Sequence, residues 1–518
     1  MACLISLLVL SSITATQLQG PKNGISAATK TKYLSSSSEN NLIYSPAMIQ
    51  NYSLPTPNAG PNSIAEGPNS TFWIAEFSAG KIAEFFSTNQ TFKEFTIPKN
   101  GTAIPNSVAV DQFGTVWFSD FLGNAIWSLN ATSGKFTEYP IPTKGSQPLF
   151  IVVDKNHNIW FTETTGYKIG ELNYPTYTMT EYTVPASNYE PLEMYLDQNT
   201  STMWITLAKT TSEVQPGLIA TFNITSKKFE TVFTPPISLQ DPVGIVMDRS
   251  GNVWISEHRG SSIVEFIPMN STWRKYNTSP PSGFYQTTIS AVATIAIDQR
   301  GDFWFIEHFG NKVGRLDPST GVIDEFDLTG TDDPFSVLDA VDSQGNFWLT
   351  NFGQNAIQMI PANTSSGIYI RTLSPTGSSY TKVEAGQTIG VSFEVKNLAP
   401  IARILTLNAT SSFSESGQTS PQEVSFNVTG DVLNLASNQS AAIEAKVTPD
   451  VALPSGLYSV SFAVMGQYST TVQVFFITVN ASPLYFIYHL SNYLQEILIV
   501  AIVILATFYF LVLRRRTS

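Results

Sequence analysis

Seven tryptophans recur through the first two thirds of this 518-residue chain at a nearly constant spacing. A period of 43 to 50 residues indicates a repeated supersecondary unit, each copy of which packs against the next. One indole ring per unit is therefore expected to lie in the core between neighbouring units. Trp273 falls outside this register and is expected to contribute less to stability. The recurring residues are Trp73, Trp117, Trp160, Trp204, Trp254, Trp304 and Trp348.

Each unit reads as four short strands joined by turns. In the second unit the segments are PNSVAV (105–110), VWFSD, NAIWSL and KFTEYPI, and DQFG forms the first turn. Seven units of four antiparallel strands predict an all-β fold, a seven-bladed β-propeller over residues 46–362. An Asp followed by Gly or Asn precedes six of the tryptophans by six or seven residues, which is typical of a tight turn. These are Asp111, Asp154, Asp197, Asp248, Asp298 and Asp342.

A ring of blades must close, because otherwise the last blade exposes an unpaired strand edge. Two segments could supply the closing strand. The segment IQNYSLP (49–55) resembles the outer strand of a unit, and GIYIRTL (367–373) lies at the outer-strand distance after Ile357. The N-terminal segment is favoured, which leaves 367–373 to the next domain.

The repeat ends near residue 362, and longer strands with alternating apolar residues follow. Examples are TIGVSFEVKN and LYSVSFAVMG. This pattern, with no helical periodicity, predicts an immunoglobulin-like β-sandwich over residues 363–482.

Both ends of the chain suggest an extracytoplasmic protein held in a membrane. The uninterrupted apolar run Ile497–Leu513 precedes three arginines, which predicts a single C-terminal transmembrane helix with the C-terminus in the cytoplasm. Several N-x-S/T sequons, such as Asn130 and Asn223, fit a glycoprotein at the cell surface. The remaining segments are a signal segment (1–19), a flexible Ser/Thr-rich stretch (20–45), a juxtamembrane segment (483–496) and a basic tail (514–518).

Charge and cysteine content exclude other classes. The net charge of −12 offers no basic footprint for nucleic acid. The single cysteine, Cys3, cannot form an intrachain disulfide. Packing and strand pairing alone must therefore stabilise the fold.

The repeat also resembles that of a known family. The pattern W-F-[ST]-E, N-K-[IV]-G and F-x-E-[YF] is illustrated by WFTETTGYKIG (160–170) and WFIEHFGNKVGRL (304–316). It is similar to the repeat of virginiamycin B (streptogramin B) lyases over residues 48–362. The resemblance implies seven blades. It also implies a carbon–oxygen lyase that uses a divalent cation such as magnesium to open a cyclic depsipeptide by elimination.

The residues that this resemblance implies for catalysis are mostly absent. The family places a histidine at the start of the sixth inner strand, where this chain has Ala293. Its E-P-H motif corresponds to Asp333, Pro334 and Phe335, and its last glutamate corresponds to Phe352. Neither Ala nor Phe can accept a proton or bind a metal. The lyase reaction by the family's route is therefore not expected.

Two histidines stand out on the same face of the propeller. His258 and His308 each follow the Trp strand of adjacent blades, directly after Glu257 and Glu307. The acidic residue recurs in five units and is expected to be structural, whereas the histidines do not recur. One hypothesis is that His258, His308 and a carboxylate hold a metal ion. The other is that the two histidines are solvated loop residues with no ligand.

Extra residues in two connections map to this face. They lie within 208–217 and 279–290, and binding residues in repeat folds concentrate in such loops. The predicted binding residues are His258, Arg259, His308, Phe284, Tyr285 and Phe335.

The function expected from these observations is recognition of an extracellular peptide, glycan or surface protein. The alternative is a divergent metal-dependent lyase or hydrolase, with His258, His308 and Glu307 as the catalytic candidates.

Overall fold

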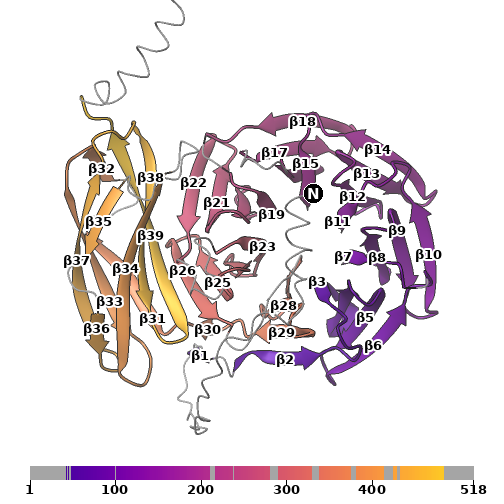
Figure 1. Ribbon diagram of the computed structural model, residues 1–518, viewed down its shortest axis with the longest axis horizontal. Helices are drawn as coiled ribbons and strands as arrows, with labels where there is room; N and C mark the ends of the chain where they lie inside the picture. The colour runs from indigo at the N-terminus through magenta and orange to yellow at the C-terminus, as the bar shows by residue number, and fades with distance from the viewer. Residues whose placement is uncertain are drawn as a thin grey trace, which may run out of the picture.

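The computed structural model describes residues 42–43, 45, 48–99, 101–209, 216–236, 239–279, 290–328, 338–374, 381–413, 424–428 and 432–483. Seven four-stranded antiparallel units are arranged in a ring, and a second β-rich unit lies beside the ring (Figure 1). The β-propeller expected from the repeat is thereby confirmed.

The first three blades follow one another in the sequence without strand exchange. Blade one consists of β3 (Pro61–Gly67), β4 (Thr71–Glu76), β5 (Lys81–Phe86) and β6 (Thr91–Thr96), with a 3-10 turn η2 (Pro68–Ser70) after β3. Blade two consists of β7 (Pro105–Val110), β8 (Thr115–Asp120), β9 (Ala125–Asn130) and β10 (Lys135–Pro140). Blade three consists of β11 (Pro148–Val153), β12 (Ile159–Glu163), β13 (Lys168–Asn173) and β14 (Thr178–Thr183).

Blades four to six repeat the same order. Blade four consists of β15 (Glu190–Asp197), β16 (Thr202–Ala208), β17 (Leu218–Asn223) and β18 (Lys228–Phe233). Blade five consists of β19 (Pro242–Met247), β20 (Val253–Glu257), β21 (Ser262–Ile267) and β22 (Thr272–Asn277). Blade six consists of β23 (Val292–Ile297), β24 (Phe303–Glu307), β25 (Lys312–Asp317) and β26 (Val322–Asp327).

The N-terminal segment closes the ring. Blade seven contains β27 (Ala340–Val341), β28 (Phe347–Asn351), β29 (Ala356–Ile360) and β2 (Gln50–Ser53), and β2 pairs with β29. Within this closing strand, Tyr52 stacks on Trp348 at 5.8 Å between ring centroids. The rival segment becomes β31 (Ile368–Ser374), which pairs inside the second unit. The favoured closing strand is confirmed. Just before it, β1 (Leu42–Ile43) pairs with β30 (Thr364–Ser365), so the end of the stretch predicted to be flexible is ordered.

The recurring Asp and Trp are partners in one hydrogen-bonded turn. In blade three, Asp154 Oδ2 accepts a hydrogen bond from Trp160 Nε1 at 3.1 Å, and Oδ1 accepts one from the backbone N–H of Asn158 at 2.9 Å. The same bond from indole to carboxylate occurs in blades two, five, six and seven at 2.8 to 3.2 Å. The motif thus satisfies the buried indole N–H and shapes the turn at the same time.

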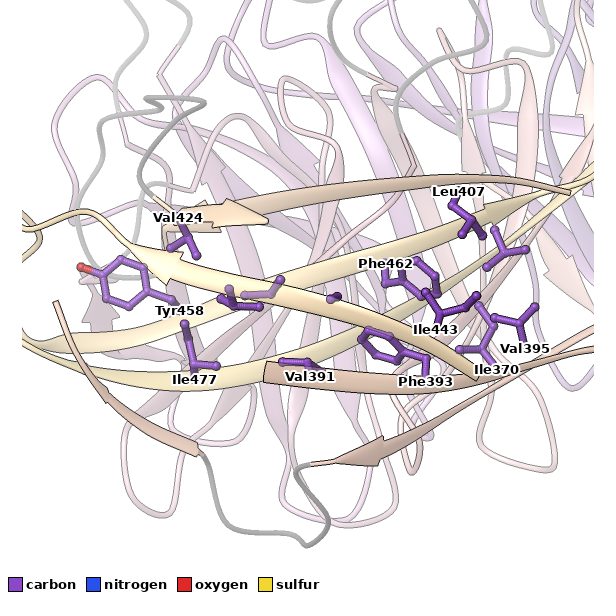
Figure 2. Packing of buried hydrophobic residues seen from close by; sticks show 14 of the residues in the cluster. Ile370, Val391, Phe393, Val395, Leu407, Val424, Ile443, Tyr458, Phe462 and Ile477 are labelled. Carbon is purple, nitrogen blue, oxygen red and sulfur yellow. The ribbon is translucent and has the colours of Figure 1, made fainter. Parts of the chain in front are cut away.

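The second unit is a two-layered sandwich around its own apolar core. One sheet has the order β31, β33 (Ile389–Asn397), β37 (Ser440–Pro449) and β35 (Val424–Val428), and the other contains β39 (Ser469–Asn480), β38 (Gly456–Met465), β34 (Arg403–Phe413) and β36 (Val432–Leu435). Phe393 and Phe462 stack across the layers at 4.5 Å (Figure 2). An immunoglobulin-like topology for this unit stays a prediction. Strand β32 (Thr381–Glu384) pairs parallel with β39.

The sandwich and the propeller share one continuous sheet. Strand β39 pairs antiparallel with β26, the outer strand of blade six, from Ser469 to Gln473 (Figure 1). Tyr276 of blade five contacts Phe476 edge-on at 5.3 Å. Thr471 Oγ1 donates a hydrogen bond to Asp324 Oδ1 at 2.9 Å. The outer edge of blade six is therefore covered, which removes an exposed strand edge.

The predicted single-pass membrane localisation is corrected by this structure. No helix in the described ranges is long and apolar enough to cross a membrane. The segment predicted to span it, Ile497–Leu513, lies outside the described residues, as do the signal segment (1–19) and the basic tail (514–518).

Candidate functional site

His258 and His308 lie on one face of the ring, called here the histidine face. Each directly follows the second strand of its blade, where the inner strand of the same blade begins. The backbone N–H of His258 donates to the carbonyl of Asp241, and that of His308 donates to the carbonyl of Ala291, both at 3.0 Å. Equivalent turns in adjacent blades therefore present the two side chains side by side.

The two imidazoles form a buried stack. Their ring centroids are 6.0 Å apart with an angle of 25° between the planes. Only 5% of His258 and 4% of His308 is exposed, and Phe309 packs 4.8 Å from the ring of His308. One hypothesis from the sequence was that both histidines are solvated loop residues. This hypothesis is wrong, because both rings are buried.

Burial decides the protonation state of His258. Desolvation lowers its pKa to about 4, and the nearby charges of His308 and Arg259 act in the same direction. The carboxylate of Asp241 opposes this shift but does not overcome it. Asp241 also pairs with Arg259, with 3.6 Å between Oδ2 and Nε. His258 is therefore a neutral imidazole at pH 7 and a weak base.

Glu307 belongs to a different cluster. Its pKa is raised to about 8, first by burial and then by the nearby charge of Glu325. Glu325 forms a buried ion pair with Lys312 at 3.0 Å. The electrostatic neighbours of His258 are Asp241, His308 and Arg259, so Glu307 is not among them. The structure does not bring the three predicted catalytic candidates together.

The cluster around Glu307 is part of the repeat. In blade one Lys81 pairs with Glu94 at 2.8 Å, and in blade three Lys168 pairs with Glu181 at 2.9 Å. Each pair lies beside a buried acid with a pKa raised to about 8, namely Glu76 and Glu163. A cluster that occurs in three blades is a feature of the scaffold.

The structure does not support the hypothesis of a metal ion held by His258, His308 and a carboxylate. Across the ranges that the structure describes, no three His, Cys, Asp or Glu side chains are grouped so that they could hold a metal ion. Two imidazoles alone make a weak ligand set.

Ala293 takes part in the hydrogen-bonded frame of the ring. It lies in β23, is 4% exposed, and its carbonyl accepts a hydrogen bond from Ser256 Oγ at 2.6 Å. In the same way, Thr206 Oγ1 of blade four donates a hydrogen bond to the carbonyl of Val243 in blade five, at 2.9 Å. The side chain of Ala293 is a methyl group with no proton acceptor.

Comparison with known proteins agrees with this architecture. Residues 42–265 match the model of the Virginiamycin B lyase family. A streptogramin B lyase structure superposes with a TM-score of 0.52 and 25% identity, covering 60% of this chain and 96% of that chain. Virginiamycin B lyase from Staphylococcus aureus matches with the same TM-score and 23% identity, covering 60% of this chain and 98% of that chain. No curated protein matches the chain.

The propeller is virginiamycin B lyase-like. The sequence resemblance is confirmed, and with it the identification of the repeat. A further structure of the S. aureus enzyme, a catalytically inactive variant with quinupristin, matches at 24% identity with a TM-score of 0.52.

Two of the positions that the lyase resemblance assigns to catalysis lie within the described residues. Ala293 stands in the inner strand of blade six, as described above. Phe352 follows β28 and packs close to Gly60, where an added Cβ would lie 2.8 Å from its ring. Asp333, Pro334 and Phe335 lie outside the described residues, as do Phe284 and Tyr285 of the predicted binding rim.

The opposite face of the ring carries a cluster of four aromatic rings that the repeat of the strands does not predict. Phe113, His157, Tyr174 and Tyr177 lie in the turns of blades two and three. Phe113 is 63% exposed, although most large apolar side chains of the ring are buried. Comparing equivalent turn positions across the units, and not only the strands, would have found it.

Proposed function

We propose that this chain is a recognition module on a virginiamycin B lyase-like scaffold, which binds a peptide, a glycan or another protein without transforming it. The single observation that carries the proposal is Ala293. It stands where the lyases resembled by this chain have a histidine, in an inner strand fixed by a hydrogen bond from Ser256. A methyl group there leaves an elimination without its base.

The histidine face supports a binding role. His258 and His308 form a buried stack with Phe309, in which the ring centroids lie 4.8 to 6.0 Å apart. A neutral His258 imidazole beside the ring of Phe309 suits recognition of an uncharged ligand group. Arg259, which is held by Asp241, adds one cationic neighbour that can contact a polar group of the ligand.

The test is a binding experiment with matched variants. The labelled full chain is applied to arrays of peptides and glycans, and the His258→Ala and His308→Ala variants are applied to duplicate arrays. The proposal expects at least one retained ligand that both variants bind more weakly. Ser250→Ala is the control, because this exposed serine lies in a turn of the other face, outside both groups of aromatic rings. Equal binding by all four proteins to every ligand would contradict a recognition site at the histidine face.

The alternative is a divergent lyase or hydrolase, and one observation favours it. The imidazole is a common general base, and the rings of His258 and His308 lie 6.0 Å apart between their centroids. This function requires product formation that disappears in His258→Ala or His308→Ala. A screen of cyclic depsipeptides and lactones with wild type and both variants distinguishes catalysis from binding.

A further inference from the structure

The aromatic cluster consists of Phe113, His157, Tyr174 and Tyr177, of which His157 is half-buried and the other three are exposed. Phe113 and His157 stack at 4.2 Å between ring centroids, and Tyr174 lies 5.3 Å from His157. Tyr177 stands 6.0 Å from Tyr174, nearly perpendicular to it. Phe113 is 63% exposed and each tyrosine is 38% exposed. Two adjacent blades thus bring three exposed rings together around the half-buried imidazole of His157.

The cluster lies on the face opposite to the histidine face. Its residues occupy the turns β7–β8, β11–β12 and β13–β14, which follow the first and third strands of a blade. His258 and His308 follow second strands. Because consecutive strands run antiparallel, these two sets of turns lie at opposite ends of each sheet. The cluster is therefore a separate site.

The other blades provide an internal comparison for each turn. At the position of Phe113, two residues after the turn Asp, the other blades with this turn have Asn156, Ser250, Arg300 and Gln344. At the position of Tyr177, the last residue of the four-residue turn, they have Gln90, Gly134, Lys227, Ser271 and Gly321. Polar or small residues thus satisfy the fold at both positions. The repeat does not require an aromatic ring at either.

His157 departs from the repeat at a cost in backbone energy. It has φ of +66°, in the left-handed region that favours glycine. The same turn position is glycine in four other blades: Gly114, Gly251, Gly301 and Gly345. For three of these, Gly114, Gly251 and Gly301, an added Cβ would meet nothing within 4 Å, so the turn leaves room for a side chain at this position. An imidazole kept at such a position indicates a role for the ring itself.

Hydrogen bonds beneath the rings hold the cluster rigid. Asn158 Oδ1 accepts hydrogen bonds from the backbone N–H of Tyr174 at 2.9 Å and from Asn173 Nδ2 at 3.2 Å. Asp154 fixes Asn158 in turn, through Nδ2 at 2.9 Å. The side chains of Gln112 and His157 are also hydrogen-bonded. The rings are therefore arranged before any ligand arrives, which reduces the entropy cost of binding.

The chemistry of the cluster selects a ligand class. None of the four side chains carries a carboxylate, ammonium or guanidinium group, and Asp111 nearby is buried and bonded to Trp117 Nε1 at 2.9 Å. The open ring faces suit an apolar C–H surface. Two tyrosine hydroxyls and the paired hydroxyls of Thr176 and Thr178 can exchange hydrogen bonds. A ligand that matches must be uncharged, have an apolar face and carry many hydroxyl groups.

We infer that the aromatic cluster of Phe113, His157, Tyr174 and Tyr177 is a carbohydrate-binding site for a pyranose ring of a neutral glycan. The sugar stacks its C–H face on Phe113, and its hydroxyls bond to the tyrosine and threonine hydroxyls at the edge. This site is independent of the histidine face and adds a second ligand to the module.

The test uses the full chain on a printed array of neutral and acidic oligosaccharides that also carries decaproline as a peptide probe. Phe113→Ala should weaken binding of the retained neutral glycan by about tenfold or more, since it removes the principal stacking surface. His157→Gly restores the glycine of the other blades, so it should weaken binding while the Tm stays unchanged or rises. Ser250→Ala, at the Phe113 position of blade five, is the matched control and should bind like wild type.

Each outcome decides the inference. Retention of neutral glycans, lost in Phe113→Ala and His157→Gly but kept in Ser250→Ala and in His258→Ala, supports it. Retention of decaproline alone would assign the cluster to a proline-rich peptide and overturn it. Retention of acidic glycans only, or of no glycan at all, would also overturn it. Loss of binding in His258→Ala alone would place the glycan on the histidine face instead.

Discussion

At the scale of single residues, the sequence shows which residues recur in the repeat, but it predicts less well which residues are buried. The recurring tryptophans were expected in the core, and Trp160 is fully buried. Trp273 lies outside the register and was expected to matter less, but it is only 7% exposed and stacks on Phe266 at 4.2 Å. Its place in an outer strand gives no 44-residue repeat, and residues of blades four and five together bury it. The burial of His258 and His308 was missed for the same reason.

Trp160→Ala is predicted to lower the free energy of unfolding by ~3–5 kcal/mol, because it removes a large buried ring and leaves a cavity. Trp273→Ala is predicted to cost a comparable amount, given its burial. Denaturant midpoints of both variants measure the effect. A Trp273→Ala variant that unfolds like wild type would show that the ring is not packed as described.

The buried His258 should make the protein less stable in mild acid. Its pKa is about 4 when folded, against 6.5 for an ordinary histidine, so the unfolded chain takes up more protons between these values. The stability is complete above pH 6.5 and is lost as the pH falls towards 4, by about 3 kcal/mol for this group. Unfolding of wild type and His258→Phe at pH 7 and pH 5 measures it. The variant should lose less stability than wild type, and an equal loss would contradict the shift.

At the scale of elements, the turns carry more information than their composition suggests. The sequence predicted that the recurring Asp makes a tight turn, and the structure adds that its second oxygen binds the indole of the tryptophan six residues later. The spacing of six thus has a structural cause. Blade four has a spacing of seven, and there the carboxylate of Asp197 binds Thr200 Oγ1 at 2.6 Å and the backbone N–H of Asn199 at 2.9 Å.

Asp154→Ala should therefore be costly and Asp197→Ala much less so. Asp154 accepts four hydrogen bonds, and its removal leaves the buried Trp160 Nε1 without an acceptor. We expect a loss of about 3 kcal/mol for Asp154→Ala and about 1 kcal/mol for Asp197→Ala. Thermal unfolding of both variants provides the comparison. If the two variants unfold at the same temperature, the bond from indole to carboxylate does not stabilise the blade.

At the scale of the whole molecule, local patterns predicted the propeller but not its junction with the sandwich. The period and the turns can be predicted from the sequence of the units. The closing strand can be predicted from its likeness to the outer strand of a unit. The pairing of β26 with β39 joins Val322 to Gln473, and nothing in either strand marks the other as its neighbour. Likewise, the loops that hold Phe284, Tyr285 and Phe335 carry no repeat, so their positions were hypotheses that stay untested.

Removing the closing strand should open the ring. Deletion of residues 1–55 removes β1 and β2, exposes the edge of β29 and takes Tyr52 away from Trp348. We expect a lower Tm and self-association, measured by thermal unfolding and size-exclusion chromatography. Deletion of residues 1–41 is the control, because it leaves both strands in place. Two deletion variants that behave alike would contradict closure by the N-terminal segment.

The central claim, a lyase-like scaffold that recognises without catalysis, is tested most directly by the rate of quinupristin opening. The full chain is incubated with quinupristin and magnesium, next to S. aureus virginiamycin B lyase and a sample without protein, and the linear product is quantified by mass spectrometry. We predict product from the relative and none above background from this chain, because Ala293 cannot accept a proton. Linear product above background that EDTA abolishes would contradict the account.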